Sequence, residues 1–133
     1  MKSGLKERVR AYLKALEVWD SAAVAAFYAE DVVQIEHPNQ LKPGGDRRGL
    51  QQMLRDLERG RGLLQRQSYE ARALLTEDDS VVALLSWKGV LAVPLGGMQP
   101  GAELQAESAV HFRFRDGLVV EQQNYDCVAP LTA

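Results

Sequence analysis

The chain has 133 residues, of which 46% are apolar and 26% are charged, and its formal net charge is −2. This length predicts one domain, residues 1–133, that buries a core without disulfides or metals. The near-neutral charge argues against nucleic acid or a membrane surface as the main partner.

Positive charge is concentrated between Arg47 and Arg72, where seven arginines accompany three carboxylates. A nucleic-acid groove needs aromatic side chains among its cations for base stacking, and only Tyr69 lies in this segment. Charged residues on the exposed side of a helix are the simpler interpretation. We therefore predict a solvated helix face and no nucleic-acid partner.

Cys127 is the only cysteine, so an internal disulfide is impossible and a reducing compartment is indicated. The first residues lack the apolar region of a signal peptide, and no segment approaches the roughly 18 apolar residues of a membrane span. We predict a cytoplasmic protein with no membrane partner, in which Cys127 is buried.

Apolar residues at helical spacing predict a first helix over residues 4–18, with Tyr12 in its buried stripe. Asp20 is predicted to cap a second, alanine-rich helix, because its carboxylate can accept from the free N–H groups there. Phe27 and Tyr28 are expected on the buried side of that helix.

A short β-branched strand is predicted at 32–37, followed by a loop over 39–46. A third helix is predicted to begin at Leu50 and to end near Gly60 or Gly62.

Four longer strands complete the chain, predicted at 66–76, 80–93, 103–115 and 118–128. Helices followed by long antiparallel strands are typical of an α+β fold. We predict three N-terminal helices packed in a strongly curved antiparallel sheet, a cone-shaped α+β barrel with a cavity between sheet and helices.

The last two strands form a hairpin whose turn is Asp116-Gly117. Its first arm carries Val110, Phe112 and Phe114 on one face, and at period two its second arm presents Gln122, Asn124 and Asp126. Polar residues that follow phenylalanines on the same face indicate either a sheet edge or a polar pocket wall.

Five side chains of the predicted sheet are expected to bind a ligand in the cavity. They are Trp87, Val110, Phe112, Gln122 and Asn124. One of them, Trp87, is assigned either to the concave face of the sheet or to a dimer contact. Asp126 is the candidate acid or base, because partial burial would raise its pKa.

His37 is the second candidate base, because strand alternation places it on the same side as Val33 and Ile35. Glu36 is expected on the opposite face unless the strand bulges, so which of the two faces the cavity stays open. With only two histidines, apparently on opposite faces, no metal site and no cofactor is predicted.

Three segments resemble the nuclear transport factor 2-like superfamily, which includes the ketosteroid isomerases and the SnoaL-like polyketide cyclases. These are Tyr-Leu-Lys-Ala-Leu at 12–16 with Ala-Phe-Tyr-Ala-Glu-Asp at 26–31, Glu-His-Pro at 36–38, and the hairpin of 111–126. The resemblance implies the cone-shaped fold and pairing into a homodimer through the sheet face. It leaves the reaction open, since this scaffold carries many functions.

The ketosteroid isomerase pattern implies that Tyr12 is an oxyanion donor and that Glu36 or His37 is the base before a proline. Val110 stands where that family has a second oxyanion donor. Because the loss of one such donor commonly removes ~3 kcal/mol of transition-state stabilisation, Val110 argues against steroid isomerisation. The SnoaL-like pattern implies Asp126 as acid or base, after the Asp-Gly-Leu-Val-Val-Glu lead-in at 116–121, although Gln122-Gln123 replaces the usual His-Trp.

Two functions are compatible with these observations. The first is an isomerase, cyclase or dehydratase that acts next to a carbonyl of a small apolar ligand, with Tyr12, His37 and Asp126 catalytic. The alternative is a non-catalytic ligand-binding or dimerisation module of the same fold.

Overall fold

A computed structural model describes residues 4–131 of the chain. The described part contains helices α1 (Leu5–Glu17), α2 (Ser21–Phe27) and α3 (Leu50–Leu63), and strands β1 (Tyr28–Glu36), β2 (Asp46–Arg48), β3 (Leu64–Glu77), β4 (Ser80–Leu91), β5 (Glu103–Arg115) and β6 (Leu118–Val128).

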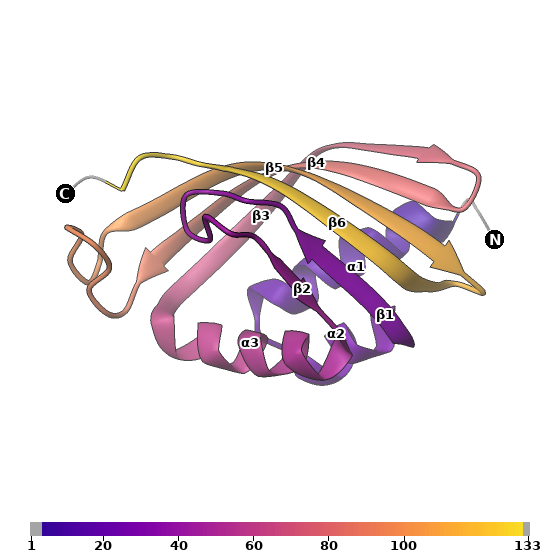
Figure 1. The fold of residues 1–133 in the computed structure, drawn as a ribbon, viewed down its shortest axis with the longest axis horizontal. Coiled ribbons are helices and arrows are strands. Elements are labelled where there is room, and N and C mark those ends of the chain that lie inside the picture. The colour runs from indigo at the N-terminus through magenta and orange to yellow at the C-terminus, as the bar shows by residue number, and fades with distance from the viewer. Residues whose placement is uncertain (1–3, 132–133) are drawn as a thin grey trace.

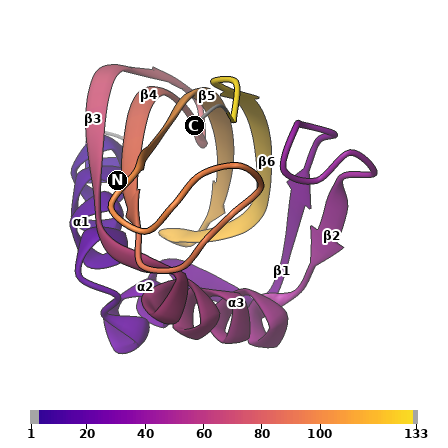
Figure 2. The same ribbon diagram turned by 90° about the vertical axis from the view of Figure 1, so that its left-hand side faces the viewer.

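The strands form one sheet in the order β2-β1-β6-β5-β4-β3. Its curvature carries it over the helices without closing into a full barrel (Figures 1 and 2). The α+β fold and the strongly curved sheet are therefore confirmed. One detail differs from a purely antiparallel sheet: β1 pairs with β6 in parallel.

The helices pack against the concave side of the sheet. Leu5, Val9 and Leu13 of α1 are buried at helical spacing, and α1 contacts β3 and α2. The predicted cap of α2 is confirmed, because the Asp20 carboxylate accepts from the backbone N–H of Ala23 at 3.2 Å. Among the described residues, no helix is long and apolar enough to cross a membrane.

The closing hairpin contains a bulge that decides which side chains point inward. Asp116 and Gly117 have φ values of 53° and 80°, as a tight two-residue turn requires. Phe114 then pairs with Val119, but Arg113 pairs with Glu121, so Val120 is an extra residue in β6. Beyond it the even-numbered residues of β6 share the face of Phe112.

Two strand predictions need correction. β1 begins at Tyr28, directly after α2, rather than at residue 32. A strand that was not predicted, β2, begins at Asp46, the last residue of the predicted loop, and its Arg48 pairs with Gln34 of β1. With only three residues, Asp-Arg-Arg, β2 has no alternation that the sequence could reveal.

Cys127 is exposed, so its predicted burial is wrong. It follows Asp126 directly in β6, and successive side chains of a strand point to opposite faces. The thiol therefore lies on the outer face of the sheet.

Gly45 holds β2 against β1 in a way that no other residue type can. Its φ is +69°, and a Cβ there would lie 2.7 Å from the Glu36 carbonyl oxygen. Gly45→Ala is expected to lower the free energy of unfolding by about 1–3 kcal/mol, because the backbone must shift. Chemical denaturation measures this loss. Gly44→Ala is the matched control, since a Cβ at Gly44 meets nothing within 4 Å; equal effects of the two substitutions would contradict the explanation.

Candidate functional site

Cross-strand pairing assembles the inner face of the sheet in rows. One row joins Arg48, Gln34, Gln122 and Phe112, from β2 to β5. The next joins Glu36, Asn124 and Val110. Asp126 pairs with Ser108 one row further along. Polar side chains therefore gather on β2, β1 and β6, although they come from distant parts of the chain.

A cavity of about 430 Å³ lies between this face and α1. Its apolar wall includes Leu13 and Leu16 of α1, Leu85 of β4, and Phe112. All five predicted ligand-binding residues line it: Trp87, Val110, Phe112, Gln122 and Asn124. Tyr12 and Asp126, which were predicted to be catalytic, line it too.

Trp87 forms part of the wall on the β3–β4 side. Its indole N–H donates to Gln67 Oε1 at 2.9 Å. The ring also lies over Gly89, where a Cβ would approach the indole to 2.6 Å. The ring therefore occupies space that only a glycine at position 89 leaves open.

Asp126 is a half-buried carboxyl in the cavity wall. Burial raises the pKa of Asp126, the negative charge of Glu36 raises it further, and the Ser108 hydrogen bond and Arg48 act in the opposite direction. Ser108 donates to Oδ1 at 2.5 Å, and no residue in the described range donates to Oδ2. The site thus offers one free carboxyl oxygen whose proton affinity is raised.

A buried hydrogen-bond relay runs from Tyr12 to Asn124. The hydroxyl oxygens of Tyr12 and Tyr28 lie 2.7 Å apart, and Tyr28 donates to Gln122 Oε1 at 2.5 Å. Gln122 in turn donates from Nε2 to Asn124 Oδ1 at 2.9 Å. Because Tyr28 has one proton and gives it to Gln122, the Tyr12 proton is directed to Tyr28. The relay occupies Oδ1 of Asn124 and leaves its Nδ2 as a donor.

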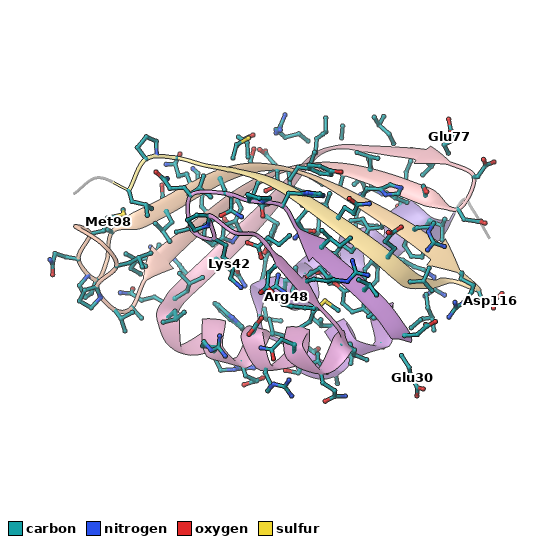
Figure 3. All side chains as sticks on the ribbon, in the orientation of Figure 1. Glu30, Lys42, Arg48, Glu77, Met98 and Asp116 are labelled. Atoms are coloured by element: carbon teal, nitrogen blue, oxygen red, sulfur yellow. The ribbon has the colours of Figure 1, made fainter. Side chains whose placement is uncertain are left out.

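Arg48 links two carboxylates in the opposite wall. Its Nη2 lies 2.7 Å from Glu36 Oε1, and its Nη1 lies 2.9 Å from Asp56 Oδ2 on α3. In Figure 3 Arg48 lies between β2 and α3. Burial acts to raise the pKa of Asp56, but the hydrogen bonds from Arg48 and Gln52 outweigh it and lower the pKa. This corrects the predicted solvated arginine face for Arg48, whose side chain is only 12% exposed.

His37 does not face the cavity, so that prediction is wrong. Its ring stacks on Tyr125 with centroids 4.3 Å apart, and its Nε2 lies 2.9 Å from Gln123 Oε1, on the outer face of β6. The pairing of Glu36 with Asn124 turns the even-numbered side chains of β1 inward. Glu36 is therefore the residue of this pair that lines the cavity.

Several side chains of the site were not predicted from the sequence: Tyr28, Arg48, Asp56, Tyr69 and Ser108. Ser108 had a usable signal, because it shares strand parity with Val110 and Phe112. Arg48 had none, because its strand was not recognised. In the part of the chain that the structure describes, no group of three or more His, Cys, Asp or Glu residues could hold a metal ion.

Arg48 stabilises the fold by neutralising two carboxylates that water reaches poorly. Arg48→Met is expected to lower the free energy of unfolding by about 3 kcal/mol, because Glu36 and Asp56 lose their common cation. Urea denaturation at neutral pH provides the measurement. Lys42→Met is the matched control: its pair with Asp46 is largely exposed, so less than about 1 kcal/mol should be lost. A loss for Arg48→Met no larger than for Lys42→Met would argue against the buried cluster.

Solved structures share this architecture. A candidate hydroxylase from Streptomyces galilaeus superposes with a TM-score of 0.79 at 19% identity, over 95% of this chain and 76% of that one. An LEH-like epoxide hydrolase from M. tuberculosis superposes with a TM-score of 0.72 at 19% identity, over 96% of this chain and 84% of that one. A candidate polyketide cyclase from Xanthomonas campestris has a TM-score of 0.71 and is 26% identical, over 93% of this chain and 90% of its own. These proteins carry different reactions on one fold.

The curated proteins contain no match to this sequence. The family model of the SnoaL-like domain, in contrast, matches residues 9–122, which include α2, α3, all five strands from β1 to β5 and the first half of β6. With the curved sheet, the covering helices and the cavity between them, this match establishes that the chain belongs to the SnoaL-like family of the nuclear transport factor 2-like superfamily.

Proposed function

We propose that the protein is an enzyme that moves a proton on the carbon next to a carbonyl of a small, uncharged ligand, as an isomerase, cyclase or dehydratase does. The observation that carries the proposal is the half-buried Asp126 carboxyl with its free Oδ2 in a 430 Å³ cavity. A raised pKa brings a carboxyl closer to the operating pH and makes it a stronger base once it is ionised.

Asn124 supplies the complementary group. Asn124 lies two residues before Asp126 on the same face of β6. The relay from Tyr12 occupies Oδ1 of the Asn124 amide and leaves Nδ2 free to donate to a ligand. The ligand carbonyl accepts from Asn124 Nδ2 while Asp126 Oδ2 takes the proton from the adjacent carbon. The C–H electron pair becomes the enolate π bond, and the developing charge on oxygen is stabilised by the Asn124 donor.

Tyr12 and Tyr28 act through Asn124 in this proposal. Their hydroxyl protons are used within the relay, so they are positioning residues rather than oxyanion donors. A non-catalytic ligand-binding module is the second candidate, favoured by this internal use of the Tyr12 hydroxyl.

Deuterium exchange separates these candidates. The protein is incubated in D2O with cyclohexanone, 2-indanone and 2-tetralone, and incorporation next to the carbonyl is followed by proton NMR. Exchange of at least one ketone is expected to rise with pH as Asp126 ionises, with a midpoint above the usual carboxyl value of about 3.9. Asp126→Asn should reduce the rate at least about 100-fold, because it removes the base.

Asp116→Asn is the matched control, since Asp116 lies in the exposed hairpin turn at the end of the molecule (Figure 3), where asparagine tolerates its positive φ. It should leave the exchange rate unchanged. Binding of a ketone without Asp126-dependent exchange would favour the non-catalytic module.

We also propose that two copies pair through the outer face of the sheet. Leu75 is 59% exposed and Tyr125 is 49% exposed there. Sedimentation equilibrium at micromolar concentration is expected to give twice the chain mass, and Tyr125→Arg should shift the protein toward monomer. Val18→Arg, at an exposed position after α1, is the control. A monomeric wild-type protein would refute pairing. A cytoplasmic location stays a prediction from the sequence.

A further inference from the structure

We propose that the ligand has a second uncharged polar group, which Gln34 binds in a second chamber beside the main cavity. This inference rests on the proposed function, because it takes the carbonyl end of the ligand to lie at Asn124 and Asp126. It adds the length and chemistry of the other end.

This second chamber has a volume of about 220 Å³ and lies among α1, α2, α3 and β1. Tyr12, Leu16, Arg48, Asp56, Tyr69 and Asn124 line both spaces. The two spaces therefore share a wall, and a ligand held at Asn124 borders both of them.

Gln34 is the side-chain amide of the chamber that has neither its donor nor its acceptor group engaged by the protein. It is only 7% exposed and lines the chamber, yet its side-chain amide makes no hydrogen bond with any residue of the described segment 4–131. An amide that faces the open space of the chamber can donate to a ligand and accept from it. Gln122, which is buried as deeply, has both amide atoms engaged. Gln34 thus offers both a free donor and a free acceptor to a ligand in the chamber.

The charges of the chamber specify an uncharged group. Its two ionised side chains, Arg48 and Asp56, are paired with each other at 2.9 Å. The rest of the lining is apolar or carries neutral hydroxyl and amide groups. An anion or a cation would enter without a free counterion, at a high desolvation cost. A hydroxyl or carbonyl can instead form hydrogen bonds with neutral groups of the lining, among them the Gln34 amide.

Sheet geometry gives the spacing of the two polar groups. Gln34 pairs with Gln122 on the neighbouring strand, and Asn124 lies two residues further along that strand. Gln34 and Asn124 are separated by one strand spacing across the sheet and by two residues along it, which places their Cα atoms about 8 Å apart. Two fused six-membered rings with oxygen atoms at opposite ends span this distance. The inferred ligand is therefore an uncharged ketone with a hydroxyl or second carbonyl about 8 Å away.

Isothermal titration calorimetry with matched ketones tests the inference. The probes are 2-tetralone, 6-hydroxy-2-tetralone, whose hydroxyl lies at the far end, and 8-hydroxy-2-tetralone, whose hydroxyl lies close to the carbonyl. The wild-type protein should bind the 6-hydroxy ketone about tenfold more tightly than the other two, because only its hydroxyl reaches Gln34. In Gln34→Met, which keeps the side-chain length, this advantage should fall below about twofold while 2-tetralone binds unchanged.

Gln51→Met, on the exposed side of α3, is the control and should retain the advantage. In addition, the Gln34 side-chain amide signals in a proton–nitrogen NMR spectrum should shift with the 6-hydroxy ketone and not with 2-tetralone. No binding of the 6-hydroxy ketone, equal affinities for the three ketones, or an advantage that survives Gln34→Met would overturn the inference. Binding does not depend on turnover, so tight 6-hydroxy ketone binding without deuterium exchange would refute the catalytic proposal alone.

Discussion

The extra residue in β6 is the constraint on which the cavity depends. If the strand continued from the Phe114–Val119 pair with strict alternation, Glu121, Gln123 and Tyr125 would face the helices. The bulge at Val120 moves the register by one residue, so Gln122, Asn124 and Asp126 face them instead. Val119 and Val120 are both buried, as expected where two consecutive residues oppose a single position of the partner strand. Residues 33–36 of β1 pair with the part of β6 that follows the bulge, so Gln34 and Glu36 share the inward face of Gln122 and Asn124.

The polar groups of the cavity are divided between those that satisfy one another and those left for a ligand. Glu36 uses one oxygen for Arg48 and the other for Asn39, and Asp56 is bonded to Arg48 and Gln52. These carboxylates are structural. Asp126, with a single hydrogen bond from Ser108, keeps an oxygen free and carries a raised pKa. The three acidic groups of one cavity therefore differ in their free oxygens and in their pKa because their hydrogen-bond partners differ.

The sequence predicted those features that have a local physical cause. Helical periodicity located α1, the Asp20 side chain marked the start of α2, and the Asp116-Gly117 pair identified the hairpin. The inward direction of Asp126 was also predicted, from the alternation of side chains along the second arm of the hairpin. The bulge at Val120, which together with the turn sets the register of that arm, was not predicted. The orientation of His37 could not be predicted, because neighbouring valine and isoleucine fit either face and the pairing with β6 decides between them. The buried Arg48 depends on a three-residue strand and a partner on α3, neither of which leaves a pattern in the sequence.

The position of Trp87 above Gly89 gives the cavity an adjustable wall that is separate from its chemistry. Any side chain at residue 89 would meet the indole ring well inside van der Waals distance and displace it from its bond to Gln67. The displaced Trp87 ring would change the shape of the cavity beside β4, whereas Asp126, Asn124 and Gln34 would keep their places on β6 and β1. The shape of the cavity at Trp87 and the polar groups of the proposed reaction therefore belong to different strands, so that a substitution can alter one without the other.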